Sequence, residues 1–368
     1  MTIDKFPLGF QERIIFSLRS LYTRYGYRQY RMSKFEEYDL YAKNKDFLIS
    51  DAVITFTDRS GKLLALKPDV TLSIVKNTAD CPETIQKLFY NENVYRISKG
   101  SRSFRELMQV GLEALGNVDD YCVAEVLSLA CRSLRSISGS CVLEISHLGI
   151  LQELIERIGI PQNQKDAVLR CIGQKNTHEL TALCRSWGIK EERIAVLTQA
   201  IRTCGAPEQV LPKLKALLTG IVSTEIFDRL QAITEILPHP DMLRFDFSVV
   251  DDVHYYNGLV FKGFIQGLPS SVLSGGQYDA LLKKMGKKSR AIGFAVYLDA
   301  LERLDPENQP YDVDVLLLCG AGTSLQTIQT RADQLRSEGR SVLVQHTVPQ
   351  GLRCREIIEL TGNGVATL

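Results

Sequence analysis

The segment from Leu107 to Leu115 alternates apolar and polar side chains, as a β-strand with one polar face does. The polar face carries Gln109, Gly111 and Glu113, with no side chain at the middle position. An amide and a carboxylate on either side of a gap can bind a small ligand that bears amine or imidazole N–H groups. A half-exposed sheet whose polar face meets water has the same pattern, so this strand alone supports both interpretations.

Four other short segments place polar side chains beside turns or helix starts: Leu66–Thr71, Phe89–Arg96, Tyr255–Gly258 and Ser274–Asp279. In the first, Asp69 and Thr71 stand two residues apart at a predicted helix start, where such residues also serve as ordinary N-terminal caps. In the last, two glycines would let backbone approach closely, before a predicted helix whose amides favour an anion. Each segment is weak alone, whereas their order and spacing are specific.

In that order, the segments resemble the class II aminoacyl-tRNA synthetase core of histidyl-tRNA synthetase. Leu66–Thr71 is similar to its Leu-Arg-Pro-Glu-Gly-Thr segment, and Tyr95–Gly116 is similar to motif 2 and the strand after it. His254–Phe261 and Ser274–Asp279 resemble its two histidine-recognition segments, and Ala291–Leu301 resembles motif 3. The resemblance covers most of residues 1–304.

The resemblance implies an α+β fold in which a six- or seven-stranded antiparallel sheet is flanked by helices. It also implies a histidine-binding pocket near Arg96, a candidate anion contact, lined by Asp69, Thr71, Gln109, Glu113, Tyr256 and Tyr278. Free histidine carries an ammonium that pairs with carboxylates and an imidazole that needs a donor and an acceptor. Asp69 with Thr71 would hold the ammonium, and Gln109 the polar backbone of the ligand. Glu113 and Tyr278 would hold the imidazole.

Several residues depart from the synthetase pattern where ATP is handled. Asp251 stands where the synthetase has a catalytic Arg, and Ala300 stands where motif 3 supplies another. Tyr297 replaces a Gly that gives the nucleotide room, Ser98 replaces a Glu after Arg96, and the motif 1 proline is Ser33. Loss of one electrostatic donor of this kind lowers a rate by about 10²–10³. We therefore expect no useful adenylation.

Residues 311–368 stand where the synthetase has a complete anticodon-binding domain. The pattern predicts a strand at Val313–Cys319, a helix at Ser324–Glu338 and a second strand at Ser341–Gln345, a βαβ-like unit. This segment carries five Lys/Arg against six Asp/Glu, whereas RNA binding favours a positive surface. We therefore expect a truncated C-terminal α/β unit that does not read tRNA.

A histidine pocket without the ATP and tRNA machinery resembles the regulatory subunits of ATP phosphoribosyltransferase, a family of histidyl-tRNA synthetase paralogues. The resemblance implies a non-catalytic protein that assembles with the short-form catalytic subunit in the first step of histidine biosynthesis. It also implies feedback inhibition by histidine as effector, and a homodimer within a hetero-oligomer. Two alternatives remain open. Asp251 and Ala300 oppose a divergent synthetase or adenylating paralogue, and the neutral C-terminal unit opposes a tRNA-binding sensor.

The elements that position these residues fall into distinct stretches of the chain. We expect residues 1–149 and 238–304 to form the synthetase-like core. Helical spacing from Phe10 to Tyr25 predicts a helix that Gly26 stops, the turn sequence Asp58–Gly61 predicts a hairpin, and Ala291–Leu304 predicts a helix. Residues 150–237 repeat Leu, Ile and Val at helical spacing, with breaks at Gly159–Pro161, Gly188 and Gly205–Pro207, and predict an insertion of four or five helices. The two prolines of Asp305–Asp312 indicate a linker before the C-terminal unit.

The composition agrees with a globular protein of two or three domains. The 368 residues are 45% hydrophobic and 24% charged with a net charge of +1, which disfavours a protein that coats nucleic acid. No run approaches the roughly 20 apolar residues of a membrane span, and a secretory signal is absent, so we expect a cytoplasmic protein. Nine cysteines without a CxxC pair, and histidines far apart, favour neither a disulfide framework nor a metal site. We expect no cofactor.

Overall fold

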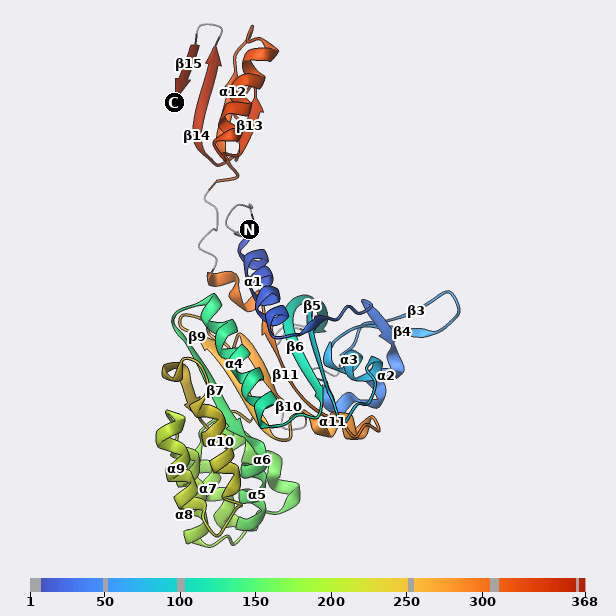
Figure 1. Ribbon diagram of the computed structural model, residues 1–368, viewed down its shortest axis with the longest axis vertical. Helices are drawn as coiled ribbons and strands as arrows, with labels where there is room; N and C mark the ends of the chain where they lie inside the picture. Colours follow the sequence, from blue (N-terminus) through green and yellow to red (C-terminus); the bar gives the residue numbers. More distant parts are fainter. Residues whose placement is uncertain are drawn as a thin grey trace. The chain divides into compact units, whose positions relative to one another are not determined.

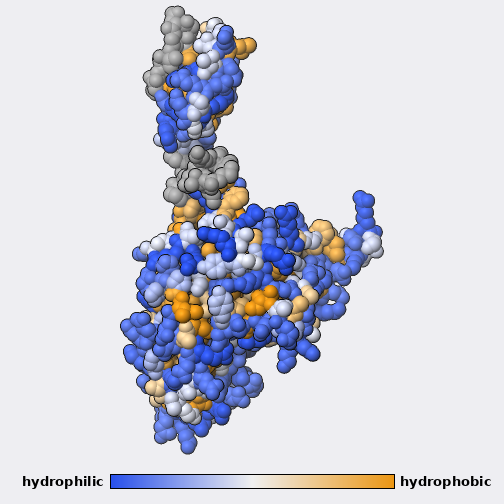
Figure 2. All heavy atoms as spheres, in the orientation of Figure 1, coloured by the Kyte–Doolittle hydropathy of each residue, from blue (hydrophilic) through white to orange (hydrophobic). Residues whose placement is uncertain are grey.

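The computed structural model describes residues 8–48, 52–97, 103–250, 255–304, 311–361 and 364–367. The chain forms two compact units, Met1–Arg303 and Leu304–Leu368. None of the helices in the described ranges is long and apolar enough to cross a membrane. The face of the first unit shown in Figure 2 is mainly hydrophilic, with apolar atoms in separate small groups.

The first unit is built on an eight-stranded sheet with the order β1-β5-β6-β11-β10-β9-β7-β8 (Figure 1). The strands are β1 (Arg28–Gln29), β5 (Ile85–Ile97), β6 (Phe104–Gly116), β7 (Cys141–His147), β8 (Leu243–Phe245), β9 (Leu259–Ile265), β10 (Leu273–Gln277) and β11 (Arg290–Tyr297). The six strands from β5 to β7 in this order pair antiparallel, and short parallel strands extend both edges. The predicted fold class is confirmed. The sheet has two short parallel edge strands, β1 and β8, in addition to the expected antiparallel strands.

Two long helices, α1 (Phe10–Arg24) and α4 (Asp120–Ile137), pack against each other and against the sheet (Figure 1). Their apolar stripes bury residues such as Leu18 and Leu127, and Tyr22 bonds Ser133 across the helix pair at 3.0 Å. Helix α1 ends just before Gly26, whose φ of +82° stops it as the sequence predicts. This layer closes one face of the central strands.

A small three-stranded sheet and short helices contribute a second core cluster of the first unit. The sheet has the order β2-β4-β3, with β2 (Phe35–Glu37), β3 (Thr55–Thr57) and β4 (Leu63–Leu66), and the helices are α2 (Tyr38–Lys43), α3 (Thr71–Asn77) and α11 (Asp279–Lys284). The predicted hairpin at Asp58–Gly61 is confirmed, because the Asp58 carboxylate accepts the amides of Ser60 and Lys62.

Six helices lie beside the β7–β8 edge (Figure 1): α5 (Leu148–Ile158), α6 (Lys165–Gly173), α7 (Thr177–Ser186), α8 (Glu191–Arg202), α9 (Pro207–Leu218) and α10 (Glu225–Glu235). The insertion therefore contains six helices, more than the four or five expected from the sequence. The glycine and proline signals predicted three breaks, and two further breaks carry weaker signals. One of them is at Lys175, which adopts a φ of +53° between α6 and α7. The other lies between α9 and α10.

The expected helix at Ala291–Leu304 is wrong. Residues Arg290–Tyr297 form the strand β11, and only Asp299–Leu304 is helical, as a short 3₁₀ turn. Strand β11 lies between β6 and β10 and is buried on both faces, so its apolar run shows no strand-like alternation.

The glycines of Ser274–Asp279 also lie elsewhere than expected. Gly275 and Gly276 are inside β10, and the six-residue α11 begins only at Asp279. The expected anion site on helix amides at these glycines is therefore wrong.

The second unit is a four-stranded sheet of order β13-β12-β14-β15 with one helix. Its elements are β12 (Val313–Cys319), α12 (Leu325–Ser337), β13 (Val342–Gln345), β14 (Cys354–Thr361) and β15 (Gly364–Thr367). Strand β12 pairs parallel to both β13 and β14, so the predicted βαβ unit is confirmed. Val315, Leu335 and Ile358 belong to its own small apolar core.

Candidate ligand-binding pocket

A pocket in the first unit encloses about 510 Å³ of unfilled space, counting its opening to solvent. It lies among β5, β6, β10 and β11, beside the start of α3. The structure brings all seven residues singled out from the sequence to its wall: Asp69, Thr71, Arg96, Gln109, Glu113, Tyr256 and Tyr278. Residues more than 200 positions apart in the chain therefore share one cavity.

Strand β6 supplies Gln109 and Glu113 to the pocket. Their exposed fractions are 3% and 2%, and every residue from Gln109 to Gly116 is buried. The polar face of this strand therefore does not meet water, which excludes the half-exposed sheet as an interpretation of its pattern.

The room left by Gly111 is occupied by a protein side chain. Gly111 faces Tyr90 on the neighbouring strand β5, and a Cβ added at Gly111 would lie 2.4 Å from the Tyr90 hydroxyl oxygen. Tyr90 lines the pocket and is buried, but the sequence pattern did not select it. The only signal that could have found it is the strand register, which pairs a tyrosine with a glycine across β5 and β6.

Glu113 is held from two sides. Thr71 Oγ1 donates to its Oε1 at 2.8 Å, and the Tyr278 hydroxyl donates to its Oε2 at 2.6 Å. Burial raises the pKa of Glu113 to about 8, and the charge of Asp69 adds to this effect while the two hydrogen bonds oppose it. The sequence grouped Thr71 with Asp69, whereas the structure bonds it to Glu113.

Asp69 combines two roles that the sequence offered as alternatives. Its Oδ1 accepts the amide of Leu72 at 2.9 Å in the first turn of α3, and it also lines the pocket. Its Oδ2 pairs with Arg96 Nη2 at 3.4 Å, and Arg96 Nε donates to the carbonyl of Pro68 at 2.6 Å. Burial raises the pKa of Asp69, and the Arg96 guanidinium opposes that shift.

Gln109 has an unused donor. Its Nε2 is buried and has no hydrogen-bond partner within the described part of the chain. Buried polar groups almost always find a partner, so an orphan at the wall of a pocket is suited to a ligand.

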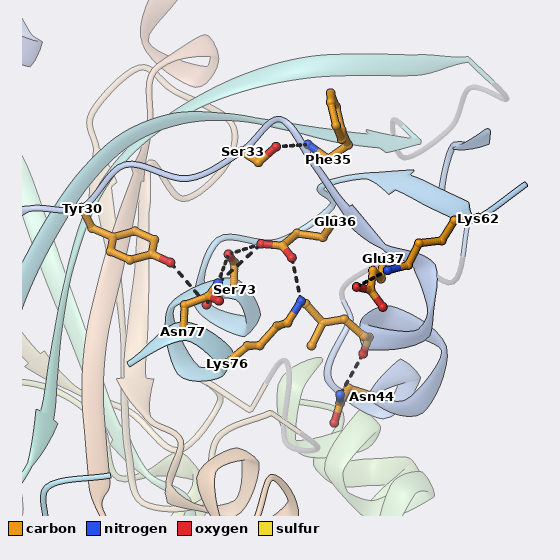
Figure 3. Close-up of polar contacts among 11 residues, drawn as sticks. Tyr30, Ser33, Phe35, Glu36, Glu37, Asn44, Lys62, Ser73, Lys76 and Asn77 are labelled. Atoms are coloured by element: carbon orange, nitrogen blue, oxygen red, sulfur yellow. Dashed lines mark hydrogen bonds and ion pairs between the residues drawn. The ribbon is translucent and has the colours of Figure 1, made fainter. Parts of the chain in front are cut away.

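Helix α3, which begins at Thr71 two residues after Asp69, is bonded to strand β2 of the small sheet (Figure 3). Glu36 of β2 accepts from Ser73 Oγ at 2.9 Å and from Lys76 Nζ at 2.8 Å, both on α3. Asn77 Nδ2 also contacts the Glu36 carboxylate, at 3.5 Å. These bonds fix α3 and therefore the pocket wall that it supplies.

The structure describes some of the residues that depart from the synthetase pattern. Tyr297 lines the pocket from β11, directly opposite Gln109 on β6. Ala300 lies in the 3₁₀ turn after β11, and Ser33 Oγ accepts the amide of Phe35 before β2. Asp251, Ser98 and His254 lie outside the described residues. Within the ranges that the structure describes, no three His, Cys, Asp or Glu side chains are grouped as a metal site would need.

The sequence matches the family model for histidyl-tRNA synthetase over residues 9–301. A protein of Oceanobacillus iheyensis named ATP phosphoribosyltransferase regulatory subunit is 26% identical, over 93% of this chain and 86% of its own length. One of the same name from Caldanaerobacter subterraneus is 29% identical, over 79% of this chain and 77% of its own length. The histidine–tRNA ligase of Methanocaldococcus jannaschii is 27% identical, over 88% and 79%.

Solved structures show the same fold. An ATP phosphoribosyltransferase regulatory subunit/histidyl-tRNA synthetase from Bacillus halodurans has a TM-score of 0.73 at 22% identity, covering 94% of this chain and 93% of that one. A chain of the ATP phosphoribosyl transferase (HisG:HisZ) complex from Thermotoga maritima has a TM-score of 0.62 at 22% identity, covering 77% and 96%. The chain belongs to the histidyl-tRNA synthetase family, and within it resembles the proteins named ATP phosphoribosyltransferase regulatory subunit.

Proposed function

We propose that this chain is a non-catalytic regulatory subunit of ATP phosphoribosyltransferase that binds histidine in the pocket around Glu113. It assembles, as a homodimer within a hetero-oligomer, with the short-form catalytic subunit in the cytoplasm. Histidine then acts as the feedback effector of the first step of histidine biosynthesis. Histidine regulates by linkage only if it binds the inhibited assembly more tightly than the active one.

Relatives support the assignment to this complex. Two relatives named ATP phosphoribosyltransferase regulatory subunit match along most of the chain. A structure with this fold is named as part of a HisG:HisZ complex, in which two kinds of subunit are assembled. By analogy, the proposal gives this chain a partner subunit that has the phosphoribosyltransferase activity.

The polar composition of the pocket carries the proposal of histidine as ligand. Two carboxylates, an amide and five tyrosine rings surround a small space, and Gln109 Nε2 has no hydrogen-bond partner there among the described residues. A free amino acid with an imidazole side chain offers a carboxylate to such a donor and N–H groups to the carboxylates. In this assignment residues 1–149 and 238–304 form the histidine-binding core, 150–237 an insertion and 311–368 a truncated anticodon-binding unit.

The second candidate function is a divergent histidyl-tRNA synthetase, which the similarity to the ligase of Methanocaldococcus jannaschii favours. Two placements oppose it. The Tyr297 ring lines the pocket, which reduces the room for a nucleotide, and the motif 3 position holds Ala300 in place of a cation. Phosphate activation depends on such cations, so the regulatory assignment is preferred.

Co-expression with a short-form catalytic subunit tests partner, role and ligand together. We expect phosphoribosyl-ATP formation from ATP and phosphoribosyl pyrophosphate only when both chains are present, and inhibition of that activity by histidine. The matched variant Gln109→Ala should keep the activation and lose the inhibition. A catalytic subunit that is equally active with and without this chain would contradict the proposal.

A further inference from the structure

Among the described residues that line the pocket, acidic groups outnumber basic groups, and Glu113 has no cation paired with it. The other described titratable residues that line its pocket are Asp69 before α3, Tyr90 and Arg96 of β5, Tyr255 and Tyr256 before β9, Tyr278 after β10 and Tyr297 of β11. Arg96 is the one cation among these described lining residues, and it is paired with Asp69. Among the described residues, Glu113 accepts hydrogen bonds only from two neutral hydroxyl groups, those of Thr71 and Tyr278.

An ionised Glu113 would therefore leave one uncompensated negative charge among the described residues that line the pocket. Burying a charge without a partner is costly, and such a carboxyl group remains protonated instead. Burial raises the pKa of Glu113 to about 8, which agrees with this charge count. With one proton on Glu113 at neutral pH, the described residues that line the empty pocket carry no net charge.

A histidine zwitterion changes this balance only at its imidazole. Its carboxylate and ammonium add one charge of each sign, and Asp69 and Arg96 offer one of each sign to receive them. The imidazole near Glu113 adds a second group that can hold a single proton, with an ordinary pKa of about 6.5. Neutrality is kept when Glu113 and the imidazole together hold one proton.

We propose that Glu113 and the ligand imidazole share one proton in the complex, so that the proton already held in the empty pocket becomes part of histidine recognition. This inference rests on the proposed function, because it assumes that histidine occupies the pocket. The proton lies between a Glu113 oxygen and an imidazole nitrogen, and no bond other than the O–H or N–H bond changes. The hydroxyls of Thr71 and Tyr278 continue to donate to the carboxylate.

The proposal predicts a bell-shaped dependence of histidine affinity on pH. Below about pH 6.5 the imidazole and Glu113 each carry a proton, and one must be lost on binding. Above the Glu113 pKa of about 8 both groups are unprotonated, and one proton must be taken up. Affinity then falls by up to about tenfold per pH unit on each side.

Calorimetric titration of the full chain with histidine between about pH 5.5 and 9 tests this, with Glu113→Gln as the decisive variant. A glutamine can donate to the imidazole without taking up a proton, so its alkaline fall in affinity should be shallower than that of the wild type by about tenfold per pH unit. The ligand ammonium also titrates at alkaline pH, but that effect is common to both proteins and cancels in the comparison.

Two further variants keep the test independent of folding. Tyr278→Phe removes a donor that favours the ionised carboxylate, so the alkaline fall should move to higher pH. Glu106→Gln, on the exposed end of the same strand, should keep the wild-type profile. Wild-type affinity that stays level or rises through pH 8, or parallel profiles for wild type and Glu113→Gln, would overturn the proposal. Absence of histidine binding at every pH would instead overturn the ligand in the proposed function.

Discussion

The carboxylate of Glu113 lies directly over the backbone of Gly293, its partner on the neighbouring strand β11. A Cβ added at Gly293 would lie 1.7 Å from Glu113 Oε2 and 2.4 Å from the carbonyl oxygen of Leu112. Only a residue without a side chain lets the glutamate reach Thr71 and Tyr278 at the same time. The glycine on one strand therefore sets the position of the carboxylate on the next.

Gly293→Ala should displace the Glu113 side chain. The carboxylate would lose the geometry of its bonds to Thr71 and Tyr278, so we expect a loss of about 1–3 kcal/mol in the free energy of unfolding and loss of histidine binding. Denaturant unfolding and calorimetry measure the two effects. Gly139→Ala is the matched control, because a Cβ there meets no atom within 4 Å. Equal effects of the two substitutions would contradict the account.

Gln109→Ala should abolish histidine binding without lowering stability. The Gln109 Nε2 has no partner in the described structure, so its removal leaves no new unsatisfied group. Glu113→Ala should also abolish binding, but it leaves the hydroxyls of Thr71 and Tyr278 without their acceptor. Calorimetry measures binding, and thermal unfolding checks that both variants are folded. Unchanged binding in both variants would show that the pocket is wrongly assigned.

The purified chain should show no histidine-dependent exchange between ATP and pyrophosphate. The motif 3 position holds Ala300 in place of a cation that would bind ATP, and the Tyr297 ring lines the pocket and reduces the room for a nucleotide. A radiolabel exchange assay with a histidyl-tRNA synthetase as positive control measures this. Exchange above background, even if slow, would favour the synthetase alternative.

Stability should depend less steeply on pH in Glu113→Gln than in the wild type. The folded pKa of Glu113 is raised from 4.5 to about 8, so the folded state holds a proton that the unfolded state releases in this range. Its contribution is full below pH 4.5 and is lost as the pH rises towards about 8, by up to about 1.4 kcal/mol per unit. Glutamine has no such titration. Urea unfolding of both proteins is measured at pH 5, 6, 7 and 8, roughly the range between those two pKa values. The difference between their free energies of unfolding should change steadily with pH, and a constant difference would contradict the prediction.

Glu36→Ala should destabilise the protein more than Glu37→Ala, although the two residues are adjacent in β2. Glu36 is 13% exposed and bonds Ser73 and Lys76 of α3, so its loss should cost about 2–3 kcal/mol. Glu37 is 51% exposed and pairs with the surface Lys62, a contact worth about 0–1 kcal/mol. Chemical denaturation gives both values. Reduced histidine affinity in Glu36→Ala alone would show that the anchor of α3 also positions Thr71.

Local patterns predicted much of the fold. The apolar spacing of α1 and the helix-stopping Gly26 were readable because a surface helix has one apolar stripe. The hairpin at Asp58–Gly61 was readable because its turn residues act locally. Strand β11 was not, because a central strand buried on both faces has an apolar run without the period that distinguishes strand from helix.

The membership of the pocket followed from the spacing of short segments and their resemblance to one family, and the structure places all seven predicted residues on its wall. The contacts among them did not follow. Thr71 and Glu113 are 42 positions apart, and Tyr278 lies 165 positions from Glu113, so only the folded chain decides that both bond one carboxylate.

Strand register decides the remaining features. Register places Tyr90 against Gly111 and Glu113 against Gly293, and Gln109 Nε2 is buried without a hydrogen-bond partner in the described part of the chain. The types and order of residues therefore indicate which ligand chemistry is present in the chain. The pairing of distant strands determines which of those groups meet, because hydrogen bonds and desolvation act over a few ångströms in space and are independent of distance along the sequence.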